Sequence, residues 1–209
     1  MPRPDQSLFL AHFTKDEHEF DEINISHTDP NPISAIGRLV SILQSKKIYA
    51  SELPWTGRKA VCFTECPWGS LIRHAEAYSP YGIGFTKKFI YSRGGNPVIY
   101  ANPRMFDAQY WEDSIYPFVT PFVPSYASDS IKRLKPFNGR TVDYSHEREW
   151  RTSKDLLFQY NNIVFVVLNR YSDMQIIPES IVKEIGESKF IFMETYKKIE
   201  ELWPTHIMT

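Results

Sequence analysis

The sequence predicts an α+β fold. Short apolar segments rich in β-branched and aromatic residues occur along the whole chain, and such segments are typical of strands. Several follow one another without the amphipathic helix that joins parallel strands, which favours a mixed arrangement over a doubly wound sheet. The 209 residues contain no internal repeat and no linker, so we expect a single domain over residues 1–209.

The first half of the chain is divided by proline and glycine. Ser7 to Thr14 is short and apolar, which predicts a strand. Apolar residues then recur at intervals of three and four over 32–47, which predicts an amphipathic helix. The other expected elements are an extended piece at 48–51, a strand at 60–64, a helix at 67–77, a strand at 81–85 whose two glycines allow close approach to the backbone, and a turn or short helix to Tyr91 capped by Thr86.

The second half is aromatic and rich in proline up to residue 136. Its predicted elements are a strand at 97–100, helical stretches around 105–112 and 126–134, a loop at 137–144, strands at 147–152 and 162–168, a helix at 178–184, a strand at 190–193 and a helix at 194–202.

Composition excludes several classes of protein. The 24 basic and 25 acidic residues nearly cancel, so no global positive field attracts nucleic acid, and any such site is local. The longest apolar runs are far shorter than the roughly 20 residues that a membrane span needs. The polar start of the chain predicts a cytoplasmic protein with free cysteines.

The motifs of several common enzymes are absent from the sequence, among them the phosphate loop, the dinucleotide fingerprint, the nucleophile elbow and the zincin helix. Cys62, Cys66 and His74 do not have the spacing of a zinc site, so we expect no bound metal.

The segment Glu147–Arg151 carries the most unusual chemistry. On a strand, Glu147, Glu149 and Arg151 share one face, while Trp150 lies on the other and can fill the core. The charged face is expected either on solvent or in a polar cleft. In a cleft, a carboxylate can stabilise an oxocarbenium-like sugar carbon, the transition state of N-glycosidic cleavage.

Four other side chains are candidates for the same cleft, each with a structural alternative. His12 can bond a ribose or simply support the first strand. Glu65 ends a strand, where it either reaches a cleft or caps the strand in solvent. Tyr78 and Tyr81 can stack on a planar ligand or fill the core.

A set of short motifs resembles the bacterial abortive-infection family AbiGi and, more distantly, the DarT-type ADP-ribosyltransferases. In order they are HFT at 12–14, ILQSKKIYAS at 42–51, VCFTECP at 61–67, YGIGF at 81–85, NPVIY at 96–100 and EREWR at 147–151. The resemblance implies an ADP-ribosyltransferase-like fold, in which two curved antiparallel sheets hold NAD between them.

The resemblance also implies roles for individual residues. His12 would bind the NAD ribose, with backbone contacts from Phe13 and Thr14, and Glu65 would line the NAD site. The aromatic residue against nicotinamide would be Tyr49, Tyr78 or Tyr81. Glu149 or Glu147 would be the catalytic acid, and ADP-ribose would pass to nucleic acid or protein in a phage-defence or toxin–antitoxin system.

Abortive-infection relatives are antitoxin-like, which leaves a second interpretation: an inactive binding module that recruits a partner protein. Its interface would be the aromatic segment at 110–126, which could also serve as a lid. A metal-dependent nuclease using Glu65, Glu147 and Glu149 is a third interpretation, for which the sequence lacks an accompanying Asp and Lys.

Overall fold

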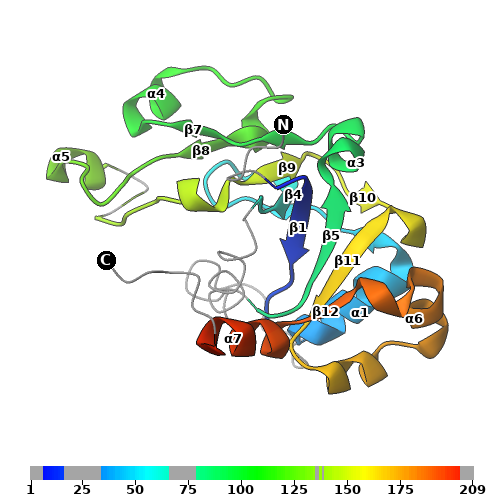
Figure 1. Ribbon diagram of the computed structural model, residues 1–209. Helices are drawn as coiled ribbons and strands as arrows, with labels where there is room; N and C mark the ends of the chain where they lie inside the picture. The colour runs from blue at the N-terminus through cyan, green and yellow to red at the C-terminus, as the bar shows by residue number, and fades with distance from the viewer. Residues whose placement is uncertain (1–6, 17–33, 66–78, 135–136, 138, 203–209) are drawn as a thin grey trace. The chain divides into compact units, whose positions relative to one another are not determined.

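The computed structural model describes residues 7–16, 34–65, 79–134, 137 and 139–202, in two compact units (Figure 1). Unit 1 comprises Met1–Lys47, Cys66–Phe89 and Leu157–Thr209. Unit 2 comprises Ile48–Glu65 and Ile90–Leu156. Each unit is therefore assembled from segments that lie far apart in the sequence.

The strands are short. They are β1 (Phe9–Phe13), β2 (Lys47–Ile48), β3 (Ser51–Glu52), β4 (Lys59–Phe63), β5 (Gly82–Thr86), β6 (Asn96–Pro97), β7 (Ile99–Ala101), β8 (Val119–Pro121), β9 (Trp150–Thr152), β10 (Leu156–Leu157), β11 (Ile163–Leu168) and β12 (Phe190–Phe192).

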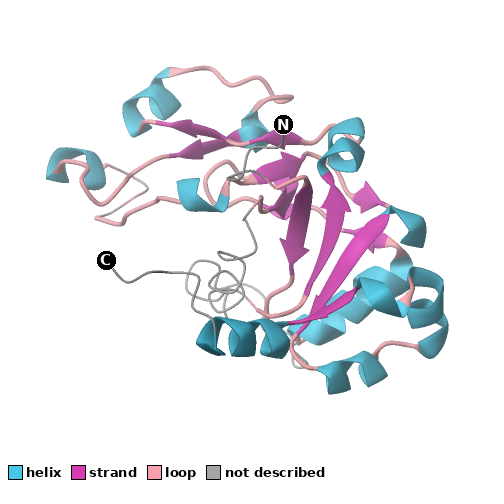
Figure 2. Cartoon of the chain, in the orientation of Figure 1, coloured by secondary structure: helices cyan, strands magenta, loops and turns pink. Residues whose placement is uncertain are grey.

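The described helices are short as well (Figure 2). The α-helices are α1 (Ala35–Ser45), α3 (Lys87–Ser92), α4 (Pro103–Ala108), α5 (Asp129–Lys132), α6 (Glu179–Ile185) and α7 (Met193–Leu202). The 3₁₀ turns are η2 (Tyr116–Phe118), η3 (Ser145–Glu147), η4 (Tyr160–Asn162), η5 (Tyr171–Ile176) and η6 (Glu187–Lys189).

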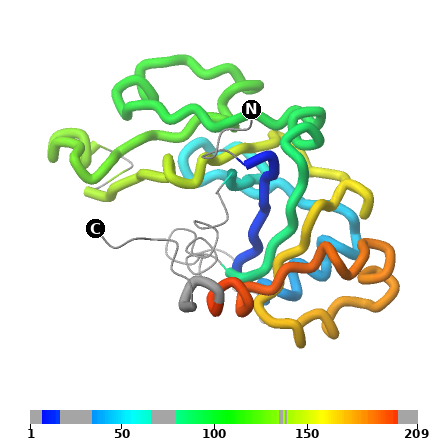
Figure 3. The backbone as a smooth tube through the Cα atoms, in the orientation of Figure 1, coloured from blue at the N-terminus to red at the C-terminus, as the bar shows by residue number. Residues whose placement is uncertain are grey.

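Unit 1 is built on a four-stranded sheet in the order β1-β5-β11-β12. The first three strands are antiparallel, and β12 adds parallel to β11. As Figure 3 shows, this strand order places the start of the chain beside its middle, and the middle beside the last third. All four strands were predicted from their apolar runs, and the described part of the chain confirms them.

The two glycines of β5 were predicted to let another group approach the backbone closely. In the structure, that group belongs to neighbouring strands of the protein itself. The Phe165 ring of β11 occupies the place where a Cβ of Gly84 would lie. A Cβ at Gly82 would lie 2.9 Å from both the His12 carbonyl oxygen and the Phe13 ring. The glycines therefore let aromatic rings cover β5.

Helix α1 is fixed at its start by β1 and by its own cap. Ser34 Oγ accepts from Gly37 N at 3.2 Å, as expected of an N-cap serine. The Thr14 hydroxyl, just after β1, donates to the Ala35 carbonyl at 2.7 Å. Leu39 and Leu43 are fully buried, in agreement with the predicted apolar stripe.

Unit 2 contains a four-stranded antiparallel sheet in the order β3-β4-β9-β6 and a parallel pair, β7-β8. One small core gathers Ala101, Phe106 and Val119. A second gathers Val123, Phe137 and Val142, and the Trp55 ring packs against both. Several small, mostly antiparallel sheets with short helices thus confirm the α+β class.

Several predicted boundaries were wrong, mostly in unit 2. The strand expected at 147–152 is only β9, because Glu147 ends a 3₁₀ turn and Arg148 takes a left-handed φ of 46°. The helix predicted at 126–134 is shorter and comprises only α5. The strand predicted at 97–100 is divided between β6 and β7. Strands β8 and β10 had no counterpart among the predictions. The predicted helix at 67–77 lies outside the described residues.

No helix in the described parts of the chain is long and apolar enough to cross a membrane.

Candidate functional site

The candidate acids all lie in unit 2, on or beside β4 and β9. Glu65 follows β4, Glu147 ends η3, and Glu149 directly precedes β9. All three are buried, as is Arg151 within β9. Sequence reasoning placed this charged face on solvent or in a cleft, but the structure buries it. Burial of charged groups requires partners, because each loses its hydration.

Arg151 provides those partners for Glu149. Its Nε donates to Glu149 Oε1 at 2.8 Å, and its Nη2 donates to Oε2 at 3.0 Å. This is the two-pronged geometry in which arginine binds a carboxylate best. The other donors reach the Pro117 carbonyl at 2.9 Å and the Thr120 hydroxyl at 2.7 Å, with a longer contact to Val119 O at 3.4 Å. We call these residues the Arg151 network.

The prediction that Glu149 and Arg151 share one face is confirmed, whereas the inclusion of Glu147 was wrong. The left-handed residue Arg148 separates Glu147 from the strand. The Glu147 backbone instead joins the end of β4, since its carbonyl accepts from the Thr64 hydroxyl at 2.8 Å and from Glu65 N at 3.2 Å.

Glu65 is bound by a side chain on the face of β9 opposite to Arg151. The Trp150 indole Nε1 donates to Glu65 Oε2 at 2.9 Å, and Trp150 pairs with Phe63 across the two strands. Trp150 was expected to fill the core from its side, but it is only partly buried and also holds a carboxylate.

The acids alter the ionisation of groups around them. Burial and then Glu149 raise the pKa of the Cys62 thiol, which pairs with Arg151 across β4 and β9. Burial and then Glu149 also raise the pKa of Tyr100. Burial, Glu147 and Glu149 raise the pKa of Tyr144, whose carbonyl accepts from the Tyr100 hydroxyl at 2.8 Å. These groups are therefore protonated at neutral pH.

Glu149 also acts on its arginine. Burial by itself would lower the pKa of Arg151, but the charge and hydrogen bonds of Glu149, together with Cys62, more than offset burial, and the pKa is raised. The pair is therefore a buried ion pair with the arginine charged.

Four described residues of the predicted NAD site, His12, Phe13, Thr14 and Tyr81, lie in unit 1, at the end of β1 and the start of β5. His12 and Phe13 belong to β1 and are partly buried. Thr14 is buried, and its amide donates to the Tyr81 carbonyl at 3.0 Å while its own carbonyl accepts from Ser79 Oγ at 2.6 Å. The backbone of Thr14, expected to contact NAD, thus joins β1 to β5.

The three candidate aromatic residues have different positions. Tyr81 lies in unit 1, and its hydroxyl donates to Asp173 Oδ2 at 3.1 Å. Tyr49 lies in unit 2, and its side chain is 66% exposed. Tyr78 lies outside the described residues.

The aromatic segment expected as an interface is mostly turned inward. Phe118 is buried, and Trp111 and Tyr116 pack against the core of Ala101, Phe106 and Val119. The Trp111 indole donates to the Phe106 carbonyl at 2.9 Å. Only two tyrosines of this segment are strongly exposed, Tyr110 at 88% and Tyr126 at 81%.

Among the described residues, no three His, Cys, Asp or Glu side chains gather closely enough to hold a metal ion.

Sequence reasoning missed the partners of Arg151 on β8 and η2, because nothing in the sequence shows that residues 117–120 pair with residue 151. It also missed a surface pocket in unit 1 that Tyr171 helps to line. A run of apolar residues at 176–178 beside the predicted helix was the signal that could have found it.

One comparison with known proteins gives a match. The family model described as "Putative abortive phage resistance protein AbiGi, antitoxin" matches residues 42–178, which is more than half of the chain. No curated protein and no solved structure matches. The matched range includes Glu65, Glu147 and Glu149 but not His12.

Proposed function

This chain belongs to the AbiGi family of abortive phage resistance antitoxins, and we propose that it neutralises a toxin by binding it directly. The toxin is a protein partner whose unopposed expression arrests growth. In this interpretation the chain acts as a binding module and needs no reaction of its own. The family match supports the antitoxin role, and one feature of unit 2 favours binding over catalysis.

That feature is the pairing of Glu149 in the Arg151 network. A carboxylate that stabilises a cationic sugar must direct its charge at the substrate. Both oxygens of Glu149 accept from Arg151, at 2.8 and 3.0 Å, and the side chain is buried. Because the guanidinium neutralises the carboxylate, little negative charge is left for a ligand. The pair is better suited to holding β9 against β8 and η2.

Co-expression tests the proposal. The toxin is identified as the product of a neighbouring gene that arrests growth alone and does not when this chain is present. We expect the two purified proteins to form a complex with a saturable binding isotherm. Relief of arrest without a complex would contradict direct binding, and no relief by this chain would contradict the antitoxin role.

A second candidate is an ADP-ribosyltransferase-like enzyme. It is favoured by the buried acids beside Tyr100 and Tyr144, because clustered buried ionisable groups often mark functional sites. NAD would be the substrate, with His12 binding the ribose, Glu149 or Glu147 the acid, and a nucleic acid or a protein the acceptor.

Calorimetric titration with NAD, followed by assay of released nicotinamide, tests this candidate. It requires binding that His12→Ala weakens and release that Glu149→Gln abolishes. If the chain does not bind NAD at millimolar concentration, the ADP-ribosyltransferase function is ruled out.

A further inference from the structure

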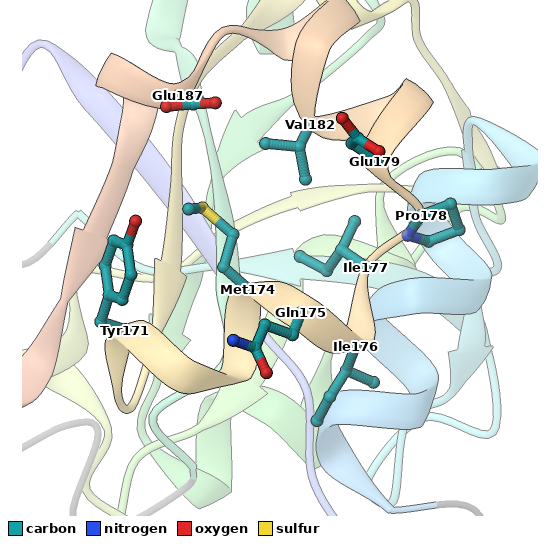
Figure 4. A pocket seen from close by; sticks show the side chains of 9 residues that line it. All are labelled: Tyr171, Met174, Gln175, Ile176, Ile177, Pro178, Glu179, Val182 and Glu187. Atoms are coloured by element: carbon teal, nitrogen blue, oxygen red, sulfur yellow. The ribbon is translucent and has the colours of Figure 1, made fainter.

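A pocket of about 390 Å³ lies on unit 1, between η5, α6 and η6 (Figure 4). Met174, Ile177 and Val182 give it an apolar lining. Its volume is at the small end of the range for ligand pockets, so it admits a few side chains rather than a large cofactor.

The walls of the pocket are held in place before anything binds. Ile177 and Val182 are buried, so they anchor the lining in the core of the unit. At the start of η5, Asp173 Oδ2 accepts from Arg170 N at 3.0 Å and from the Tyr81 hydroxyl at 3.1 Å. Glu194 of α7 accepts from Tyr171 N at 2.9 Å. A fixed site loses less conformational entropy when a partner docks.

Large apolar side chains at the pocket remain in contact with water. Tyr171 is 61% exposed and Ile176 is 55% exposed. Covering such side chains would gain hydrophobic free energy, and their position beside a concave surface gives a partner a place to insert. The two strongly exposed tyrosines of the segment at 110–126 do not line this pocket.

The negative charge at the edge of the pocket indicates which kind of partner would bind there. Glu179 and Glu187 lie at its edge, and no Lys, Arg or His is among the described residues that line it. Glu179 does pair with Lys183, but both side chains are largely exposed, and such surface pairs contribute little free energy. An acidic edge around an apolar floor is complementary to an apolar segment with neighbouring basic residues.

We propose that this pocket is where the toxin docks, through an apolar segment that carries Lys or Arg beside it. The inference rests on the proposed antitoxin function and adds its binding surface. The apolar side chains of the segment fill the space beside Ile176 and Met174, while its basic side chains face Glu179 and Glu187.

The test is calorimetry with the purified toxin, identified by the growth arrest that this chain relieves. Ile176→Glu and Glu187→Lys change exposed positions of the pocket, so both variants should keep the wild-type circular dichroism spectrum. Each is expected to weaken toxin binding at least about tenfold. Glu184→Lys reverses a charge on α6 outside the pocket lining, and Tyr110→Ala with Tyr126→Ala alters the other aromatic surface. Both controls are expected to bind as the wild type does.

The outcomes separate the two proposals. If the wild type binds the toxin and the pocket variants bind equally well, the pocket assignment is wrong and the antitoxin function stands. If only the Tyr110 and Tyr126 variants lose binding, the interface lies in unit 2. If the wild type forms no complex, direct binding itself fails.

Discussion

Arg151 and Glu149 form a buried ion pair with further hydrogen bonds to β8 and η2, so its contribution to stability can be tested. Glu149→Ala leaves a buried guanidinium without its counter-ion, and such losses cost about 3–5 kcal/mol. Glu149→Gln should cost less, because the amide oxygen still accepts one bond from Arg151. Urea denaturation measures both changes in the free energy of unfolding.

A surface ion pair provides the control for that measurement. Arg58 and Asp113 pair with side chains that are 46% and 81% exposed, and Asp113→Ala is expected to cost at most about 1 kcal/mol. Equal losses for Glu149→Ala and Asp113→Ala would contradict the structural role of the Arg151 network.

Tyr81 predicts a specific loss of stability in alkali. Burial and then Asp173 raise the pKa of Tyr81 to about 12, whereas in the unfolded chain a tyrosine ionises at about pH 10. Between these values the unfolded chain has lost a proton that the native chain keeps, so the free energy of unfolding falls as pH rises. Tyr81→Phe should make this fall shallower in urea denaturation from pH 9 to about 12.

The exposed Tyr110→Phe serves as the control and should follow the wild-type curve. If Tyr81→Phe does so as well, burial and Asp173 do not raise the pKa of Tyr81.

At the scale of single residues, the sequence predicted which side chains are unusual but not what holds them. Glu149 and Arg151 could be placed on one face because strand alternation is a local rule. The Thr120 and Pro117 partners of Arg151 lie 31 and 34 positions away in sequence, and no local pattern indicates that pairing. Trp150 was assigned to the core because indoles are usually buried, yet its Nε1 also needs an acceptor, which Glu65 supplies.

The packing of β5 against β11 depends on the absence of a side chain at Gly84. A Cβ there would overlap the Phe165 ring, so Gly84→Ala is expected to lower the free energy of unfolding by about 1–3 kcal/mol. Adding Phe165→Leu should recover part of that loss, because the smaller side chain leaves room. Strictly additive losses in the double variant, measured by thermal denaturation, would contradict the overlap.

In the aromatic segment of unit 2, substitutions at two adjacent positions are expected to change stability by very different amounts. Trp111 packs on a core cluster and donates to the Phe106 carbonyl, so Trp111→Ala is expected to cost about 2 kcal/mol or more of stability. Tyr110 is 88% exposed, and Tyr110→Ala should change stability by less than about 0.5 kcal/mol. Denaturant midpoints of the two variants give the comparison; similar values would contradict this division.

At the scale of elements, unit 1 was predicted well and unit 2 poorly. The strands of unit 1 have continuous apolar runs such as IVFVVL in β11, and such runs dominate their local structure. The strands of unit 2 have two to five residues, and β6 contains a proline. Their pairing is set by long-range contacts such as those of Arg151, which override local preference.

The whole chain joins two such units and belongs to an antitoxin family. Its predicted NAD site draws on residues of both: His12 and Thr14 from unit 1, and Glu65 and Glu149 from unit 2. If the chain acts by binding, the two units have separate roles: the buried acids stabilise unit 2, and the pocket of unit 1 contacts the toxin.

The most direct test of the central claim is calorimetric titration of the purified chain with the purified toxin, with NAD as a parallel titrant. We expect saturable binding of the toxin, weakened by Ile176→Glu, and no release of nicotinamide from NAD. Absence of toxin binding, together with nicotinamide release that Glu149→Gln abolishes, would contradict the claim and identify the chain as an enzyme.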